Sequence, residues 1–453
     1  MSDTMTSRAT TSAVLTTKHA YEVVVIGAGP AGLAAATAAA IAGKRVAVLD
    51  DNVRAGGQIW RVGFGAAHED RERGRVAEAF TLSGAELFSG RQVVDVPQSG
   101  ELQAWAAERQ VLETFQYDKL ILATGARERF LPFPGWTLPG VFGVGGLQAH
   151  VRGGYDVRGK RVVVAGAGPL LLAVAAHLRR DGAEIVTVAE QTSMFRLALF
   201  TASLITRPRK ILQGIHLRME LAGVPYRTGC WPMAVEGMQA ITGVRLTDGS
   251  RTWMEPCELL ACGFHLVPNT ELASLLGCRI GADGVEVDAD QQTSLAGVYC
   301  AGELTGIAGV DGALIEGEIA GLSAAGNTAS HLHAKRDAEA AFGRAMARAF
   351  ALRPELRLLP APETIVCRCE DVRFADLKAR STPHGGWTDA KLQTRCGMGP
   401  CQGRICGPAL ETLFGWRNAS VRPPLFPIPV AAMCSAPQAQ EELSHSLSQE
   451  TTR

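Results

Sequence analysis

A glycine-rich turn between an apolar strand and an alanine-rich helix constrains this fold more than any other feature. Residues 23–26 are continuously apolar, as in a strand buried on both faces of a sheet, and the loop 27–32 reads Gly-Ala-Gly-Pro-Ala-Gly. A second strand, 45–49, follows the helix and leads into Asp50. A G-x-G-x-x-G loop that follows a strand, opens a helix and precedes an acid at the next strand end predicts a dinucleotide-binding Rossmann unit.

Each glycine has its own physical role in such a loop. Gly27 allows the tight turn, Gly29 lets a pyrophosphate approach the backbone, and Gly32 lets the helix pack closely on the strand. The helix N-terminus offers free N–H groups to the phosphates, and the Asp50 carboxylate can accept hydrogen bonds from ribose hydroxyls. The expected contacts are Gly27, Gly29, Pro30, Ala31, Gly32 and Asp50. The alternative is a glycine turn that binds no ligand.

Three further motifs favour FAD as the dinucleotide. Gly57-Gln58 follows Asp50, Thr124-Gly125 closes a later apolar strand, and Gly302-Glu303 ends the run 297–303. Together they resemble the two-dinucleotide-binding-domain flavoproteins of the disulfide-reductase-like class. The resemblance implies that Gly57, Gln58, Thr124, Gly125, Gly302 and Glu303 also contact FAD, with the last segment along the ribityl chain. That segment usually ends Gly-Asp in this class, so the carboxylate of Glu303 lies one methylene further out.

A second strand–turn–helix–strand pattern covers residues 161–190. Its loop begins like the first, but Leu171 stands at the third glycine position, where a side chain should push the helix from the strand or block a phosphate. Glu190 occupies the position of a ribose-binding acid. The resemblance implies an NAD(P)H site, whereas Leu171 favours a retained fold with no nicotinamide role or with another nucleotide. The chain has no C-x-x-C pair, which argues against dithiol exchange.

Five of the 11 cysteines fall between residues 367 and 406. Cys367 and Cys369 are two residues apart, so in extended backbone their side chains point the same way, and Cys401 and Cys406 form a second pair. Two such pairs can supply four thiolates to one iron–sulfur cluster. Structural zinc also takes four thiolates, but zinc ribbons favour C-x-x-C knuckles, which neither pair has. A module without metal is the third option, and Cys396 is interpreted as a spare thiol.

The segment 363–408 closely resembles the bacterioferritin-associated-ferredoxin-like [2Fe–2S] domain. The run 394–403, Thr-Arg-Cys-Gly-Met-Gly-Pro-Cys-Gln-Gly, is its most specific stretch. The resemblance implies that Cys367, Cys369, Cys401 and Cys406 are the ligands of a [2Fe–2S] cluster. The expected fold class is therefore α/β, a Rossmann-like flavoprotein with two dinucleotide-binding domains and a C-terminal ferredoxin-like module.

Charge and hydropathy exclude several functions. Basic and acidic residues balance at 45 each, so no overall field draws the chain to nucleic acid or to an anionic membrane. No apolar run reaches the roughly 18 residues of a membrane-spanning helix, and residues 1–20 lack the basic start and apolar centre of a signal peptide. The chain is expected in the cytoplasm, with peripheral attachment to the inner membrane through a complex as an alternative.

The order of motifs and the proline-rich connections divide the chain. We expect a flexible N-terminus (1–20), an FAD-binding domain in two pieces (21–131 and 290–345), a second, NAD(P)-like Rossmann domain (132–289), the [2Fe–2S] module (363–420) and a flexible tail (435–453). The plan is thus one dinucleotide domain interrupted by another, followed by a small metal module.

This order of domains resembles the FAD-bearing subunit of octopine and nopaline oxidases, hydrogen cyanide synthase and dye-linked proline or D-hydroxyproline dehydrogenases. The resemblance covers residues 21–408. It implies an electron-transfer subunit of a hetero-oligomeric oxidoreductase that acts on CH–NH donors such as opines and imino acids. The implied partners are a flavin-dependent subunit of the amino-acid-oxidase type, a small third subunit, and a quinone or dye as electron acceptor. FMN shared with a partner subunit is a further implied cofactor.

Two other functions stay open at this point. One is a self-contained NAD(P)H-dependent reductase with FAD and an iron–sulfur cluster, and the other is a non-enzymatic iron-handling protein. No residue can be assigned as a catalytic acid or base toward a substrate, because the histidines are scattered along the chain.

Overall fold

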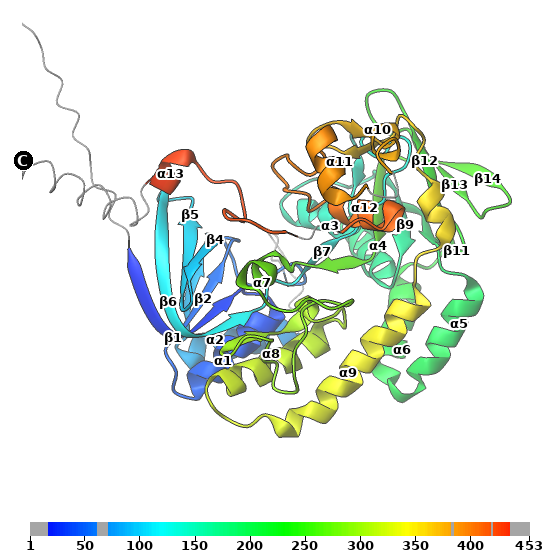
Figure 1. The fold of residues 1–453 in the computed structure, drawn as a ribbon. Helices are drawn as coiled ribbons and strands as arrows, with labels where there is room; N and C mark the ends of the chain where they lie inside the picture. The colour runs from blue at the N-terminus through cyan, green and yellow to red at the C-terminus, as the bar shows by residue number, and fades with distance from the viewer. Residues whose placement is uncertain (1–16, 61–70, 382–384, 418–419, 435–453) are drawn as a thin grey trace, which may run out of the picture.

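The computed structural model of the chain describes residues 17–60, 71–381, 385–417 and 420–434. Two Rossmann-like lobes, each built on its own sheet, lie side by side, and a small cysteine-rich module lies over the second lobe (Figure 1). Of the two segments predicted to be flexible, 1–20 and 435–453, residues 1–16 and the whole of 435–453 lie outside the described residues.

The first lobe is built on a seven-stranded sheet. Across the sheet the strands are β3 (Glu86–Ser89), β2 (Val46–Asp50), β1 (Lys18–Ile26), β6 (Val111–Leu122), β5 (Glu101–Ala106) and β4 (Arg91–Gln98), with β17 (Val298–Cys300) also beside β6. The strands β3, β2, β1, β6 and β17 run parallel, whereas β5 and β4 extend the sheet in antiparallel pairing. All of β2 is buried, which explains its continuous apolar sequence.

The sheet begins earlier than the sequence indicated. Strand β1 starts at Lys18, which pairs with Thr114 of β6. The last three residues of the predicted flexible segment 1–20 are therefore part of the sheet, because backbone pairing with β6 holds them in place.

Helix α1 (Pro30–Ile41) is alanine-rich because α8 (Val310–Ala324) packs on it at very short range. A Cβ atom on Gly317 would lie 2.2 Å from the carbonyl oxygen of Ala31, and one on Gly321 would lie 2.2 Å from that of Ala35. Small residues on both helices thus bring the two backbones together. This contact fixes the N-terminus of α1, where the first glycine loop ends.

The second lobe is built on a parallel sheet flanked by a small antiparallel one. The parallel strands are, in order, β11 (Tyr226–Thr228), β10 (Glu184–Glu190), β9 (Arg161–Ala167), β15 (Leu259–Phe264) and β8 (Val141–Phe142), and the antiparallel strands are β12 (Trp231–Glu236), β13 (Gly243–Thr247) and β14 (Thr252–Pro256). The helices of this lobe are α3 (Val144–Arg152), α4 (Leu170–Arg180), α5 (Met194–Ser203) and α6 (Pro208–Glu220). The helices α5 and α6 lie at the outer edge of the lobe (Figure 1).

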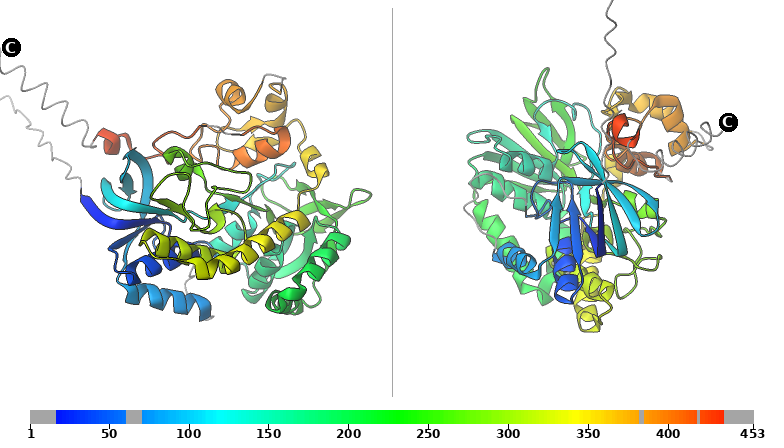
Figure 2. Two further views of the ribbon diagram at one scale, coloured as in Figure 1. Left: turned by 60° about the horizontal axis from the view of Figure 1, so that its bottom comes forward. Right: turned by 90° about the vertical axis from the view of Figure 1, so that its left-hand side faces the viewer.

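Several segments tie the lobes together. The pair β7 (Ala126–Glu128) and β16 (Leu266–Pro268) carries the chain between them, and the long helix α9 (Ser330–Ala349) runs from the first lobe to the second (Figures 1 and 2). Helix α7 (Glu271–Leu276) was expected in the second domain, but Leu272 and Ala273 pack in the core of the first lobe. The chain therefore returns to the first lobe before residue 290.

The cysteine-rich module has a core of its own around Trp387. It consists of β18 (Ile365–Cys367), β19 (Val372–Arg373), α10 (Phe374–Lys378), α11 (Trp387–Thr394) and α12 (Cys406–Phe414). Beyond it the chain crosses back to the first lobe, where the Leu425 amide donates to the carbonyl oxygen of Val94 and α13 (Val430–Cys434) follows (Figure 2). Among the described residues, no helix combines the length and apolar character needed to cross a membrane.

Candidate functional site

The first glycine loop has the geometry of a phosphate cradle. Gly27 has a φ of 104°, and a Cβ there would lie 2.3 Å from the Ala123 carbonyl oxygen. A Cβ on Gly32 would lie 1.8 Å from the carbonyl oxygen of Gly27. At Gly29, in contrast, an added Cβ would meet only the Cα of Gly57, at 3.9 Å. Two glycines are thus required by the chain itself, while the third borders open space.

This open space lies at the N-terminus of α1. Gly29 is the N-cap of the helix, and within the described residues no side-chain capping hydrogen bond is formed at this helix start. An uncapped helix start beside an open glycine is suited to hold an anionic group, because the amides and the helix dipole both favour negative charge. The loop therefore fits the pyrophosphate of a dinucleotide.

Asp50 is buried at the end of β2, beside this loop. Its Oδ2 accepts a hydrogen bond of 2.5 Å from the Ala28 amide, and its Oδ1 accepts from the Asn52 amide at 2.8 Å. The carboxylate thus braces the glycine loop. Oδ1 also accepts from the Asn52 side chain at 2.9 Å, so Oδ2 is the oxygen that can accept a further hydrogen bond, as contact with a ribose would require.

The other predicted FAD motifs gather around the same helix start. Gly57 has a φ of 59° and would place a Cβ 2.9 Å from the Cα of Gly29, while Gly302, with a φ of 79°, would place one 2.8 Å from the Cβ of Ala31. Glu303 follows Gly302 directly and is largely buried, and this burial raises the pKa of its carboxyl to about 6. Segments about 270 residues apart in the sequence thus meet at one site.

A large cavity extends from this site toward the second lobe. Its volume is about 2040 Å³, well above the roughly 300–1,000 Å³ of a typical ligand pocket. Gln58 and Glu303 line it on the side of the first lobe, and Gly168 and Leu170 line it on the side of the second. The predicted flavin residues and the second glycine loop therefore face one shared space.

The second glycine loop differs from the first at Leu171, the position of the third glycine, as the sequence indicated. Leu171 is 1% exposed and packs in the core of the second lobe, and α4 begins at Leu170, the fifth loop position, whereas α1 begins at the fourth. Glu190 is fully buried, and its two oxygens accept from the amides of Gly168 and Thr192, each at 2.8 Å. Desolvation raises the pKa of this carboxyl. Leu171 thus turns into the protein, and Glu190 braces its own loop.

Sequence reasoning missed Glu128, which lines the shared cavity. Its oxygens accept hydrogen bonds from the amides of Gly145, at 2.7 Å, and Gly146, at 3.0 Å, in the first turn of α3. Burial raises its pKa. The signal that could have pointed to it is the charged run Arg127-Glu128-Arg129 directly after the Thr124-Gly125 motif.

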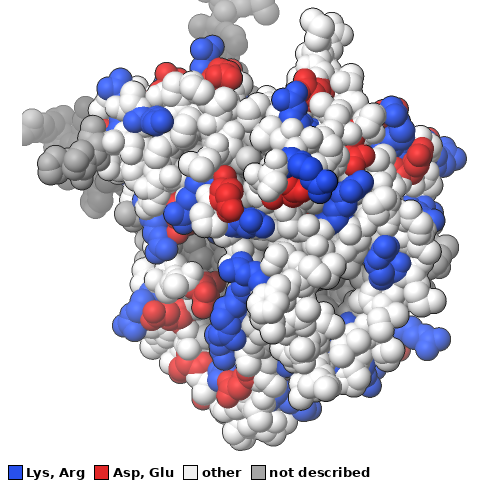
Figure 3. Space-filling model, turned by 90° about the vertical axis from the view of Figure 1, so that its right-hand side faces the viewer, with Lys and Arg blue, Asp and Glu red and all other residues white. Residues whose placement is uncertain are grey.

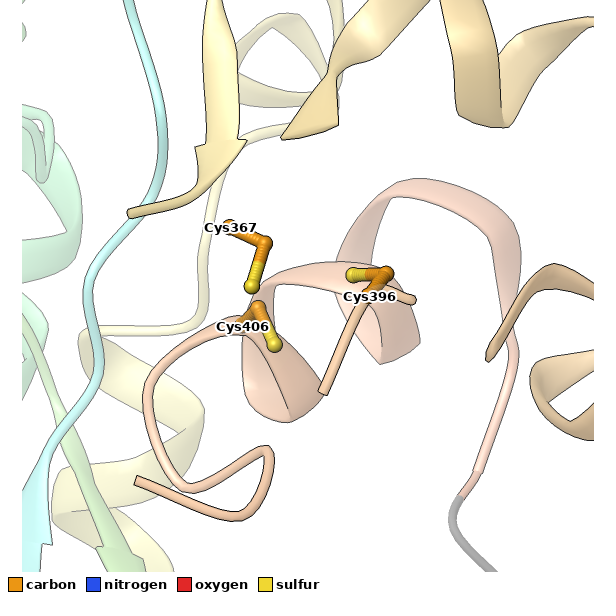
Figure 4. A group of neighbouring side chains, drawn as sticks. All are labelled: Cys367, Cys396 and Cys406. Carbon is orange, nitrogen blue, oxygen red and sulfur yellow. The ribbon is translucent and has the colours of Figure 1, made fainter. Parts of the chain in front are cut away.

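The cysteines of the C-terminal module come together in the structure. The sulfur atoms of Cys367, Cys396 and Cys406 all lie within 4.8 Å of one another, and all three side chains are buried (Figure 4). Cys369 is exposed and Cys401 half-buried, and these two are hydrogen-bonded neighbours. Cys396, interpreted from the sequence as a spare thiol, therefore lies beside two of the predicted ligand cysteines, because the turn after α11 points its side chain inward.

The buried thiols are electrostatically unequal. The thiols of Cys396 and Cys406 both interact with the sulfur of Cys367 and lower its pKa to about 2, and the same contact raises the pKa of Cys396 to about 12. A group of cysteine sulfurs in which one is stabilised as the thiolate is typical of sites that bind iron–sulfur clusters or zinc. The donor set therefore fits a metal centre.

Three glycines let the cysteine loop close. A Cβ on Gly397 would lie 2.9 Å from the Trp387 ring and one on Gly403 would lie 3.0 Å from it, so this loop wraps directly around the indole. A Cβ on Gly399 would lie 2.2 Å from the Cβ of Cys369. The loop thus wraps tightly, and it brings the two predicted cysteine pairs to one place.

A hydrogen-bond network connects the flavin motif to the cysteine loop. The Thr124 hydroxyl donates to the carbonyl oxygen of Asn269, and the Asn269 side-chain amide donates to that of Thr124. The Arg127 guanidinium donates to the Asn269 side chain at 2.8 Å, pairs with Glu271, and donates through Nε to the Arg404 carbonyl oxygen at 3.0 Å. Arg404 lies between Cys401 and Cys406, so one arginine joins the two predicted cofactor sites.

Comparisons with known proteins agree with this arrangement. The profile of the family described as pyridine nucleotide-disulphide oxidoreductase matches residues 21–329. The chain is 33% identical to one subunit of the opine oxidase of Agrobacterium tumefaciens (strain Ach5), with 93% of each chain covered. It is 30% identical to the HcnB subunit of hydrogen cyanide synthase from Pseudomonas protegens, with 93% of this chain and 98% of the relative covered.

A solved structure shares the fold over nearly the whole chain. L-proline dehydrogenase from P. horikoshii aligns with a TM-score of 0.66 at 17% identity, covering 92% of this chain and 80% of the other. The similarity in fold therefore extends beyond the residues that the family profile matches.

Proposed function

Because the chain belongs to the pyridine nucleotide-disulphide oxidoreductase family, and within it to the family of these opine oxidase subunits, we propose that it is the electron-transfer subunit of a complex that oxidises opines or related secondary amines. Membership alone makes it a flavin-dependent electron-transfer oxidoreductase with a Rossmann-like α/β fold. The substrate class, the hetero-oligomer and the iron–sulfur cluster are the parts that we add.

In this proposal the first lobe holds FAD. The pyrophosphate lies at Gly29 and at the N-terminus of α1, formed by Pro30, Ala31 and Gly32, and Asp50 faces the ribose. The remaining FAD contacts are Gly27, Gly57, Gln58, Thr124, Gly125, Gly302 and Glu303. The open space at Gly29 and the uncapped helix start support this assignment.

The C-terminal module holds a [2Fe–2S] cluster in this proposal. Its ligands are Cys367, Cys369, Cys401 and Cys406, and Cys396 is a fifth thiol beside them. FAD would take up electrons in pairs and release them singly, and a cluster of this type would carry one electron at a time. The protein's task is to hold the two groups at a fixed separation and to shield them from water.

The observation that carries the proposal is the Arg127 network. Two redox-competent sites on one chain need a fixed relative position, and the hydrogen bonds from Thr124 through Asn269 and Arg127 to Arg404 provide one. No substrate-binding acid or base is needed on such a subunit. The amine would be oxidised on a flavin-dependent partner of the amino-acid-oxidase type, with a small third subunit, FMN shared with a partner and a quinone or dye as acceptor completing the assembly.

The alternative is a self-contained NAD(P)H-dependent reductase. One experiment separates the two functions. The full chain is purified alone and in complex with its partner, and each sample is mixed anaerobically with NADH or with a panel of opines and imino acids while flavin absorbance is followed. We expect amine-dependent bleaching of the complex only, and no rapid bleaching of the isolated chain by NADH, because Leu171 and Glu190 reshape the second loop. Rapid bleaching of the isolated chain by NADH would replace the proposal with the reductase.

A further inference from the structure

Helix α5 is apolar on nearly all sides, yet none of its residues is buried. Leu197 and Phe200 turn toward the protein, where the Phe200 ring packs on Phe350 with centroids 5.3 Å apart. Phe195 and Leu199, on the opposite side of the helix, are 73% and 57% exposed. A helix that is hydrophobic all round is normally enclosed by protein or lipid, so α5 has an unoccupied apolar side.

Helix α6 shows the same property beside it. It also has no buried residue, and Leu212, Ile215 and Met219 are all more than half exposed. These three residues follow the i, i+3, i+7 spacing that marks the face of a helix packed against something else. Ile205, in the turn between the helices, is 79% exposed. We call the residues Phe195, Leu199, Ile205, Leu212, Ile215 and Met219 the α5–α6 surface.

The charge around the α5–α6 surface is almost all positive. Between residues 194 and 220 the basic side chains are Arg196, Arg207, Arg209, Lys210 and Arg218, and the one acid is Glu220. Arg207 pairs with Glu339 and Lys210 with Asp311. In the described part of the chain no ion pair is formed by Arg196, Arg209 or Arg218. The side of the molecule that carries α5 and α6 has broad uncharged areas, with Lys and Arg and also some Asp and Glu around them (Figure 3). The complementary surface is therefore apolar with an acidic rim.

The same two helices line the cavity that reaches the predicted flavin site. Met194 and Leu197 of α5 and Ile211 and Ile215 of α6 form part of its wall, and Gln58 and Glu303 lie on the other side. Of the six residues of the α5–α6 surface, Ile215 also lines this cavity, so an occupant of the surface would lie against the outer side of the cavity wall. A flavin-bearing protein with an acidic rim can match both the apolar residues of this surface and the arginines around it, whereas a second copy with the same basic rim cannot.

We propose that the α5–α6 surface is where the flavin-dependent partner subunit docks, through an apolar surface rimmed with acidic side chains. The inference rests on the proposed function, because it names the site at which the proposed partner binds. Docking covers the exposed sides of α5 and α6, and it places the partner against the helices that lie across the cavity from Gln58 and Glu303.

The test is the double variant Phe195→Glu/Leu212→Glu. Both side chains are more than 60% exposed, so the variant should fold and keep its flavin. The matched control is Met238→Glu, at an apolar side chain that is 96% exposed between β12 and β13. Each tagged full-length chain is co-expressed with the subunit that makes the preparation reducible by an amine, and the Kd of the complex is measured by dilution. We expect the double variant to raise this Kd at least about 100-fold and the control to leave it unchanged.

A second measurement tests the charge and the position. Arg209→Glu should weaken assembly, and the salt dependence of the Kd should be smaller than in the wild type. Hydrogen exchange of residues 194–220 should slow when the partner binds. Unchanged assembly of the double variant would overturn the inference and leave the proposed function standing.

The other occupants give distinct results. If the double variant assembles normally but no longer binds vesicles of phosphatidylglycerol that the wild type binds, the surface is a lipid contact and the inference is wrong. It is equally wrong if the double variant only converts a dimer of the isolated chain into a monomer. If no co-expressed subunit makes the wild-type preparation reducible by an amine, the proposed function fails first and the partner site with it.

Discussion

Among single residues, Gly29 gives the sharpest test of the flavin site. Of the residues that the structure describes, only Gly57 comes within 4 Å of a Cβ added there, with its Cα at 3.9 Å, so a valine should be accommodated by the protein but occupy the expected phosphate cradle. We expect Gly29→Val to fold and to lose FAD, read as the yellow absorbance of the purified chain. The control is Gly74→Val in α2 (Arg71–Ser83), where no described residue lies within 4 Å of an added Cβ. Full flavin content in the Gly29 variant would show that the site lies elsewhere.

The cysteine ligands are also tested residue by residue. Cys401→Ser removes a proposed ligand, whereas Cys396→Ser removes the fifth thiol, which lies within 4.8 Å of Cys367 and Cys406. Because serine is a poor iron ligand, we expect the first variant to lose the visible [2Fe–2S] absorption and the paramagnetic signal of the reduced state while keeping FAD. The second should keep both. Equal loss in the two variants would mean that Cys396 belongs to the ligand set.

Glu303 predicts a pH dependence. Burial raises the pKa of its carboxyl to about 6, above its ordinary value of 4.5, so the folded state holds this proton more tightly than the unfolded state does. The free energy of unfolding should therefore fall by about 2 kcal/mol as the pH rises through this interval. In Glu303→Gln this component is absent. Urea unfolding at pH 5 and pH 8 should show that the free energy of unfolding of the variant, relative to that of the wild type, is higher at pH 8 than at pH 5. If the difference between the two proteins is the same at both pH values, the Glu303 carboxyl does not titrate with a raised pKa.

At the scale of secondary-structure elements, the contact of α1 and α8 leaves the least room for a larger side chain. Gly317→Ala would place a Cβ 2.2 Å from the Ala31 carbonyl oxygen, so the helices must separate. Overpacking of this kind costs roughly 1–3 kcal/mol, and we expect that loss in urea unfolding, together with weaker FAD binding, because α1 starts the phosphate cradle. The control is Gly214→Ala in α6, with open space around it, which should be neutral or stabilising by up to about 1 kcal/mol.

Elements with a strong local pattern could be predicted from the sequence. The expected strands at 23–26 and 45–49 belong to β1 (Lys18–Ile26) and β2 (Val46–Asp50), and the expected helix between them is α1 (Pro30–Ile41). The later apolar strand, which was predicted to end before Thr124-Gly125, is the end of the twelve-residue β6. The antiparallel strands β4 and β5 were not predicted, because their place in the sheet comes from pairing with distant residues and not from a period in their own sequence.

The site could be predicted where spacing carries the chemistry. The glycine motifs and the cysteine pairs were found because each has a short, characteristic pattern. The inward position of Cys396 was not, since it depends on how the loop turns after α11 around Trp387. Arg127 and Glu128 were also missed, because their partners are 17 to 277 residues away in the sequence.

At the scale of the whole molecule, Arg127 decides how the flavin lobe and the cysteine module are held together. Its guanidinium pairs with Glu271 at 2.8 Å, and both side chains are 21% exposed, so the pair is largely shielded from water. Its Nε donates to the carbonyl oxygen of Arg404 in the loop between Cys401 and Cys406. Arg127→Ala would leave Glu271 without this partner and free the loop from the lobe.

We expect Arg127→Ala to lower the free energy of unfolding by about 1–3 kcal/mol, and to speed hydrogen exchange in residues 399–406 while both cofactors remain bound. Reduction of the cluster after an amine pulse should slow, because the separation of the two sites is no longer fixed. The control is Arg158→Ala, which removes a solvent-exposed ion pair with Asp156 and should leave the free energy of unfolding nearly unchanged. If exchange in 399–406 and cluster reduction are unchanged in Arg127→Ala, the module is held by its other contacts, such as the hydrogen bond from Trp136 to Ile365.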